Sequence, residues 1–519
     1  MRIGIDVGGT HTDAVLMDGD HVVSSTKALT SEDVTSGILD ALESILSDSG
    51  VKEESIEAVM LGTTQFTNAV VERKKLSEVA AIRIGLPSGK GLPPKIGWPR
   101  DISQSLGDHV YMVHGGTLYD GRPVAELDPA EINAVVADIK ARKLDTVAIS
   151  AAFSPMTSQP EKTVAEQLKR EIPGVNITCS YSLGRLGLLE RENAALLNAS
   201  LLKFADSVVT SFGEALRRRG LTCRFFVSQN DGTLMDAEFV RQFPALTFAS
   251  GPTNSLRGAC KLTGLDDAIV VDIGGTTADI GILQGGFPRE SNIVIEVGGV
   301  RTNFRMPDIL ALGLGGGSLV TDEGRCIGPE SVGHNLVTEG LAFGGSSLTA
   351  TDLLVAAGKV NLGPNQRSVE LPAATVKNGL KTIQAMLSQG IEKMMPSSDP
   401  MPVVLVGGGA ILVADKLDAA SEMHCPEHSG VANAIGAAIA QIGGEVERLV
   451  SYQEMPREEA IRVMSQEARS IAIDAGADAN TIRIADIEET TISYMAEGST
   501  RLRIKAVGDI DRESHRGAK

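Results

Sequence analysis

Residues 3–13 (IGIDVGGTHTD) and residues 270–279 (VVDIGGTTAD) are two copies of nearly the same motif. In each copy an apolar run leads to an Asp, then to Val or Ile, Gly-Gly-Thr and a second Asp, and another apolar run follows. A β-branched run interrupted by Gly-Gly is typical of a strand, a tight turn and a second strand, because glycine adopts the positive φ that such turns require. The repeat therefore predicts two β-hairpins with polar tips.

The residue types at these tips point to phosphate. Small residues let backbone N–H groups and Thr hydroxyls approach a phosphate closely, and an Asp at a strand end can hold Mg²⁺ through water. A single Gly-Gly-Thr is more simply explained as a hairpin turn. Two copies with an Asp in the same place favour phosphate binding, because a turn does not need that carboxylate.

Composition limits the class of protein. A chain of 519 residues that is 42% hydrophobic can bury several cores, so we expect a multidomain globular protein. A formal charge of -18 argues against nucleic-acid and anionic-membrane partners, which attract Lys and Arg. The five cysteines are scattered without a C-x-x-C spacing, which predicts reduced thiols. We find no signal-peptide pattern and no apolar run of membrane-spanning length, and we therefore expect a cytoplasmic protein.

Two glycine-rich stretches follow the second motif. Residues 306–320 join Asp308 to three consecutive glycines, and the apolar run 403–406 ends in three more. Glycines after a buried strand leave no side chain in the way, so a base or ribose can lie on the backbone there. Asp308 either faces substrate or metal or has a turn role, and the residues alone do not decide between these.

Other polar segments have competing interpretations. Thr63 and Thr64 follow an apolar run and precede a predicted helix, where they can either contact substrate or cap the helix. Residues 190–193 (EREN) lie inside a long predicted helix, and we interpret their charges as a solvated face. Trp98, in a loop rich in Gly and Pro, is expected to pack on its own domain. Residues 424–428 (HCPEH) are predicted as a surface loop in preference to a metal site, since the proline breaks any helix there.

The order of these segments resembles the superfamily of actin, sugar kinases and heat-shock ATPases, in which two related α/β domains clasp ATP. The sequence is further similar to the hydantoinase A/oxoprolinase family. The motifs that carry this resemblance are residues 4–13, 62–74, 272–279, 308–318 and 349–352. The resemblance implies an α/β fold of duplicated actin-like (ribonuclease H-like) ATPase domains around a nucleotide cleft. It places an N-terminal domain at residues 1–180, a second at 181–450 and a small α+β appendage at 451–519.

The resemblance also implies an activity. Family members spend ATP to open cyclic amides such as 5-oxoproline or hydantoins, and relatives carboxylate ketones. Transfer of the γ-phosphoryl group to an amide oxygen creates an imidate that water can attack, and this transfer needs mainly positioning and charge neutralisation. The implied cofactors are ATP and Mg²⁺, and the implied partner is a hydantoinase B-type subunit in an oligomer. A carboxylase subunit, a small-molecule kinase and an ATPase chaperone or reactivating factor are the alternatives.

The resulting site assignments fall into three groups. The predicted catalytic residues are Asp6, Asp272 and Asp308. Asp6 and Asp272 would hold Mg²⁺, unless Asp272 orients the nucleophile, and Thr63, Thr64 and Asn68 would contact substrate. His11 stands where the family more often has an aromatic residue. The predicted nucleotide-binding residues are Gly8, Gly9, Thr10, Thr12, Asp13, Gly274, Gly275, Thr276, Thr277, Asp279, Gly315, Gly316, Gly407, Gly408 and Gly409, although Asp13 and Asp279 can instead simply cap their hairpins.

Overall fold

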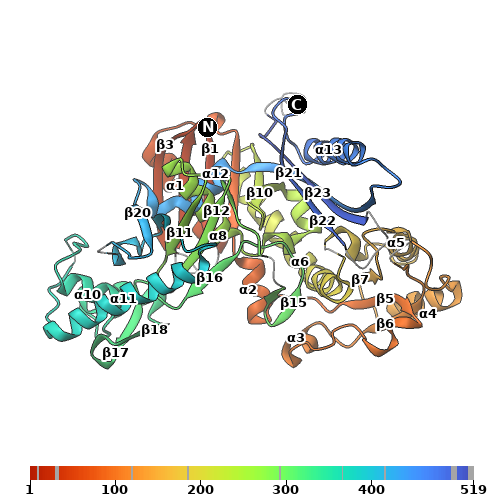
Figure 1. Cartoon of the computed structure of the whole chain (residues 1–519), viewed down its shortest axis with the longest axis horizontal. Helices are drawn as coiled ribbons and strands as arrows, with labels where there is room; N and C mark the ends of the chain where they lie inside the picture. The colour runs from red at the N-terminus through yellow and green to blue at the C-terminus, as the bar shows by residue number, and fades with distance from the viewer. Residues whose placement is uncertain are drawn as a thin grey trace.

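The computed structural model describes residues 1–8, 11–29, 34–118, 121–183, 186–291, 294–364, 366–413, 416–492 and 499–511 (Figure 1). Its largest sheet has nine strands, in an order that interleaves the two ends of the chain. Across the sheet these strands are β22 (Arg483–Thr491), β23 (Ser499–Gly508), β21 (Gln441–Ser451), β10 (Thr233–Asp236), β9 (Arg224–Ser228), β4 (Ala58–Thr63), β1 (Arg2–Val7), β2 (His11–Asp18) and β3 (His21–Leu29).

A second sheet has six strands and repeats part of this pattern. β11 and β12 form a hairpin and β19 runs parallel to β11, just as β1 and β2 form a hairpin and β4 runs parallel to β1. Both predicted hairpins are therefore confirmed. The strands of this sheet are β13 (Phe287–Pro288), β12 (Ala278–Gln284), β11 (Ala268–Ile273), β19 (Met401–Val406) and β20 (Ala420–His424), with β16 (Ile309–Leu312) paired to β12.

Two helices pack against each other between the hairpin-bearing sheets. α8 (Ser250–Thr263) contacts β11, β12 and β19, whereas α12 (Ala432–Ile439) contacts β1, β2 and β4. The helices can approach closely because Gly258 and Gly436 have no side chains. A Cβ atom on Gly258 would collide with the carbonyl of Ala432, and one on Gly436 with the carbonyl of Asn254. Small residues thus let two helices with polar side chains reach the ends of both hairpins.

A separate four-stranded parallel sheet lies at one end of the molecule, and helices α10 (Ala350–Ala356) and α11 (Ala373–Met394) lie at the other (Figure 1). The strands of this four-stranded sheet are buried among apolar side chains, which suits a parallel sheet covered by helices. It consists of β6 (Val110–His114), β5 (Ala80–Leu86), β7 (Thr146–Ala151) and β8 (Asn176–Cys179), with α4 (Pro129–Ala141) and α5 (Gln159–Glu171) beside it.

The long helix α6 (Leu188–Arg218) corrects the prediction of a solvated face at residues 190–193. Arg191, Glu192 and Asn193 are buried. Glu192 forms a two-pronged ion pair with the buried Arg83 on β5, and Arg191 donates to the main-chain oxygen of Ala151. The helix pattern alone did not show this, because the partners that neutralise these charges lie on distant strands.

The C-terminal segment extends the largest sheet. β23 pairs with β21 along its whole length and β22 pairs with β23, so these two strands continue the sheet that holds the first hairpin. No helix among the described residues is both long and apolar enough to cross a membrane. The remaining elements are α1 (Val34–Ser49), α2 (Gln65–Glu72), α3 (Arg100–Ser105), α7 (Ala237–Gln242), β14 (Ile295–Val297), β15 (Val300–Thr302), β17 (Ser318–Thr321), β18 (Cys326–Ser331), α9 (Leu336–Glu339), α10 (Ala350–Ala356), α11 (Ala373–Met394) and α13 (Arg457–Asp474).

Candidate nucleotide site

The first hairpin places two carboxylates side by side. Asp6 near the end of β1 is paired in register with Asp13 on β2, and both are buried. The Asn433 side chain on α12 donates to both, at 3.1 Å to Asp6 and 2.9 Å to Asp13. Asn254 on α8 donates to Asp6 at 3.2 Å, and Lys27 forms an ion pair with Asp13 at 2.6 Å. Asp6 is therefore held from both central helices.

The second hairpin repeats the acidic pair with different partners. Asp272 at the end of β11 lies opposite Asp279 on β12. The Ser255 hydroxyl on α8 donates to Asp272 at 2.5 Å. Ser255 follows Asn254 directly, so adjacent residues of one helix bind the leading Asp of each hairpin.

Burial and mutual repulsion make this cluster hold protons more tightly than free carboxyls. Burial, together with the charges of Asp13 and Asp272, raises the pKa of Asp6 to about 6. Burial and the charge of Asp272 raise the pKa of Asp279 to about 7. The pKa of Asp272 is raised mainly by burial as well. A cation brought between these groups would relieve the repulsion and favour their ionised forms.

Glycines on the neighbouring strands make room for both leading carboxylates. A Cβ atom at Gly62, beside Asp6 on β4, would collide with the Asp6 carboxylate and with the Asn254 amide. A Cβ atom at Gly407, just after β19, would collide with the Asp272 carboxylate. Each Asp therefore lies beside a glycine that belongs to the adjacent parallel strand or directly follows it. This pairing of Asp with glycine also repeats, and the motif alone did not show it.

Both glycine-rich loops meet the tip of the second hairpin. Gly316 donates its N–H to the oxygen of Gly274 at 3.0 Å, and Gly317 to that of Gly275 at 2.8 Å. From the other loop, Gly409 donates to Ile273 at 2.7 Å. The structure thus brings residues 274–277, 315–317 and 407–409 together, as required of one binding surface.

The predicted substrate residues lie beside the first hairpin. The Thr64 hydroxyl donates to the main-chain oxygen of Val7 at 3.3 Å, and Asn68 donates to the Thr64 hydroxyl at 3.5 Å. The Thr63 hydroxyl accepts from the N–H of Gln65 at 3.2 Å, as a residue at a helix start does. All three predicted residues are therefore near the end of β1.

Other predicted residues are placed elsewhere or not described. Gly9 and Thr10 lie outside the described residues. Gly8 donates its N–H to the oxygen of His11 at 3.0 Å, which closes the strand ends, and Thr12 is buried in β2. Asp308 is not brought to the tips. It forms an ion pair with Arg289 at 2.6 Å. Asp308 comes just before β16, and the residue of β16 that lies opposite Asp279 is Ala311, three positions further along the chain.

Sequence reasoning missed the polar helix residues that bind the carboxylates. Asn254, Ser255 and Asn433 stand out only as polar residues among small ones, a signal that equally fits turn and cap chemistry. Within the described ranges, no group of three or more His, Cys, Asp or Glu side chains is arranged to hold a metal ion, and His424 of the HCPEH segment lies beside Glu422 at 3.3 Å. Any cation at the hairpins would thus depend on water or phosphate oxygens for part of its coordination.

Two hairpin-bearing sheets that clasp a pair of central helices, with an acidic residue at the end of each leading strand, define the α/β fold of the actin-type ATPases. The hydantoinase/oxoprolinase N-terminal region profile matches residues 2–172, and the hydantoinase/oxoprolinase profile matches residues 191–396. The chain belongs to the hydantoinase/oxoprolinase family.

Two relatives with known names are identical to this chain at about a quarter of the aligned positions. The caprolactamase subunit alpha of Pseudomonas jessenii is 27% identical over 69% of this chain and 54% of its own length. The acetophenone carboxylase gamma subunit of Aromatoleum aromaticum is 25% identical over 69% of this chain and 53% of its own length. The chain therefore spans little more than half of these relatives.

Solved structures show the same fold. The crystal structure of the ATP-dependent caprolactamase from Pseudomonas jessenii superposes with a TM-score of 0.81, at 19% identity, over 99% of this chain and 88% of that chain. Nucleotide-free acetone carboxylase gives a TM-score of 0.67 at 17% identity, over 98% of this chain and 88% of that chain. The family thus includes ATP-dependent enzymes that hydrolyse a lactam and others that carboxylate ketones.

Proposed function

We propose that this chain opens a cyclic amide by ATP-dependent phosphorylation of the amide oxygen. The observation that carries the proposal is the facing pair of acidic hairpins bound by adjacent residues of α8. The charge of Asp272 is one cause of the raised pKa of Asp6, as expected of groups that meet a metal–nucleotide complex. The caprolactamase relative supports an amide as the compound that is activated, and the carboxylase relatives support the alternative of a ketone.

In the proposed site each part of the repeat has one task. Asp6 and Asp272 would hold Mg²⁺ through water, and this ion would supply charge neutralisation to the phosphates. The N–H groups of residues 274–277 and the glycine loops would bind phosphate and ribose. Asn254, Asn433 and Ser255 keep the two carboxylates oriented toward the space between the hairpins. Thr63, Thr64 and Asn68 would contact the amide.

The proposed chemistry balances without a further co-reactant. The amide oxygen forms a bond to the γ-phosphorus, the bond from this phosphorus to its bridging oxygen breaks, ADP leaves, and the amide N–H proton is released. Water adds to the ring carbon, and the C–N bond breaks as the nitrogen takes up a proton. A second water adds to the acyl carbon of the resulting acyl phosphate, and phosphate departs with the former amide oxygen.

We also propose that the chain works with a second subunit. The named relatives are designated subunits alpha, beta and gamma of their enzymes. A hydantoinase B-type subunit in an oligomer is the partner that the family resemblance suggests.

Phosphate release measured across a panel of compounds tests the proposal. The panel contains 2-pyrrolidinone, hydantoin, 5-oxoproline, acetophenone and glucose, with mass spectrometry of the products and with the partner subunit added in a second series. We expect a cyclic amide to stimulate phosphate release and to yield the ring-opened acid. Stimulation by acetophenone with a carboxylated product would assign the carboxylase function instead, and a phosphorylated sugar would assign a kinase.

A further inference from the structure

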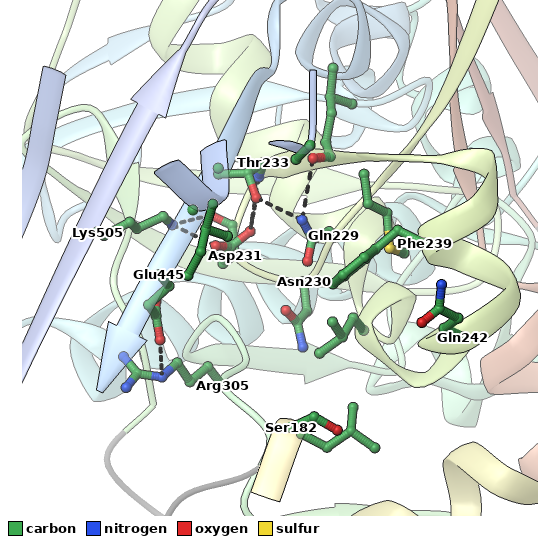
Figure 2. Close-up of a pocket in the computed structure, with 18 of the residues that line it drawn as sticks. Ser182, Gln229, Asn230, Asp231, Thr233, Phe239, Gln242, Arg305, Glu445 and Lys505 are labelled. Atoms are coloured by element: carbon green, nitrogen blue, oxygen red, sulfur yellow. Dashed lines mark hydrogen bonds and ion pairs between the residues drawn. The ribbon is translucent and has the colours of Figure 1, made fainter. Parts of the chain in front are cut away.

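A cavity of about 550 Å³ opens beside the loop that follows β9. Its walls come from this loop, from residues 303–305, from α7 and from β21 (Figure 2). Small-molecule sites in proteins typically measure roughly 300 to 1,000 Å³. The cavity, which we call the Asn230 pocket, therefore has the size of a ligand site, and none of the residues assigned to phosphate lines it.

Asn230 gives this pocket an unused hydrogen-bond donor. The residue is only 4% exposed, and its main chain is fixed by bonds from its N–H to Leu246 at 2.8 Å and from the Thr253 hydroxyl to its oxygen at 3.0 Å. Its side-chain Nδ2, however, has no hydrogen-bond partner. Figure 2 shows this side chain extending from the loop after β9 on the side of the pocket where Ser182 lies. A buried amide donor without an acceptor is unfavourable, so an oxygen atom of a ligand would satisfy it.

The strongest charges in the wall are already paired with one another. Lys505 binds Asp231 at 2.7 Å, and although burial raises the pKa of Asp231, the lysine lowers it to about 2. Arg305 binds Glu445 at 3.1 Å and also Glu447. No unpaired cation among these groups faces the pocket to attract a carboxylate or phosphate. The carboxylates of Asp236, Glu238 and Asp474 also line the pocket, so the wall repels anions and favours a ligand without negative charge.

Apolar side chains complete the pocket. Phe239 on α7, Phe304 and Leu246 line it together with the Asn230 amide. A ring with several methylene groups would bury its apolar surface against these side chains, while a carbonyl oxygen accepts from Asn230. An uncharged cyclic amide has both features.

The pocket also lies beside the candidate phosphate site. β1, β4 and β9 are parallel neighbours, so their carboxyl ends share one edge of the sheet. At this edge Asp6 lies near the end of β1, Thr63 is the last residue of β4, and Asn230 follows the end of β9. Two strand spacings separate the outer strands, which is roughly 10 Å. Crevices outside the carboxyl ends of parallel strands are the usual ligand sites of α/β sheets.

We infer that the Asn230 pocket binds the uncharged cyclic amide that ATP activates, with Asn230 donating a hydrogen bond to an oxygen of that compound. This inference rests on the proposed function and adds the place where the substrate binds. Thr63, Thr64 and Asn68 do not line the Asn230 pocket, so the inference replaces their assignment to the amide. It makes Asn230 a residue that determines affinity for the amide and not for ATP.

Ligand-observed NMR on the full chain tests this inference without requiring turnover. The probes are 2-pyrrolidinone and hydantoin, and the proteins are the wild type, Asn230→Leu, Phe239→Ala and the control Asn133→Ala, an exposed residue of α4. We expect Asn230→Leu to weaken amide binding about tenfold, Phe239→Ala to weaken it several-fold, and the control to bind as the wild type does. Phe239 is 38% exposed, so its variant reports on the pocket even if Asn230→Leu fails to fold.

Two results would overturn the inference. One is that neither amide binds the wild type, and the other is that both pocket variants bind as tightly as the control. If the amides stimulate phosphate release while the pocket variants leave their KM unchanged, the inference fails and the proposed function stands. If the amides bind through Asn230 but never stimulate phosphate release, the proposed function fails and the pocket stands.

Discussion

The two hairpins share a motif but differ in how their carboxylates are held. In the first, Asn254 and Asn433 donate to Asp6, and Lys27 neutralises Asp13. In the second, Ser255 donates a side-chain hydrogen bond to Asp272, and Asp279 has a pKa raised to about 7. The duplicated backbone therefore carries two electrostatic environments. In the first, the leading Asp6 has a pKa raised to about 6 and is held by two amide side chains, whereas in the second it is the trailing Asp279 whose pKa is raised to about 7.

The largest expected effect is loss of turnover when either leading carboxylate is removed. Asp6→Ala and Asp272→Ala should each lower ATP turnover by about 10³-fold or more, because each removes an anionic group that positions the metal–nucleotide complex. Steady-state phosphate release measures this, and circular dichroism with thermal melting checks that the fold survives. Wild-type rates in a folded variant of either residue would remove that hairpin from the site.

The pH dependence of the wild type should show the protonation of Asp6. This residue has a raised pKa of about 6, so it is ionised above that pH and neutral below it. The kcat/KM for ATP, which reports the free protein, should therefore fall on the acid side, by about tenfold for each pH unit below 6. A profile that is flat between pH 5 and pH 8 would show that ionised Asp6 is not required.

Variants of Asn433 and Ser255 distinguish the titration of the first hairpin from that of the second in the same assay. The Asn433 hydrogen bond lowers the pKa of Asp6, so Asn433→Ala should move the acid limb to higher pH and lower turnover several-fold near pH 6. Ser255→Ala acts on Asp272 and serves as the matched control, with the Asp6 limb unmoved. Equal displacement of the acid limb by both variants would mean that the hairpins do not titrate separately.

The smallest effect concerns stability. The folded-state pKa of Asp279 lies above its unfolded value. The contribution of protonated Asp279 to the free energy of unfolding is therefore fully present below about pH 4 and is lost as pH rises through about 7. Asp279→Asn should therefore stabilise the nucleotide-free protein by about 1–2 kcal/mol at pH 8 and by nothing measurable near pH 4. Urea unfolding at both pH values measures this, and a gain that is the same at both would contradict the assigned titration.

The hairpins and glycine loops could be predicted because their information is local. A β-branched run, two glycines and an Asp specify a strand, its turn and its polar tip within a few residues. The partners of the carboxylates could not be predicted, since Asn433 lies 427 residues from Asp6 along the chain and reaches it only through the packing of α12 on β1. The same limit explains residues 190–193, whose charges are buried because Arg83 and Ala151 lie on other elements.

The central claim is that the hairpins bind ATP so that its γ-phosphoryl group is transferred to an amide oxygen. An isotope experiment tests it directly, with a cyclic amide carrying ¹⁸O in its carbonyl group, the full chain together with any partner subunit that turnover requires, and mass spectrometry of the released phosphate. We predict that the label appears in inorganic phosphate, because phosphate departs with the former amide oxygen. Phosphate that stays unlabelled while the amide ring opens would contradict the account.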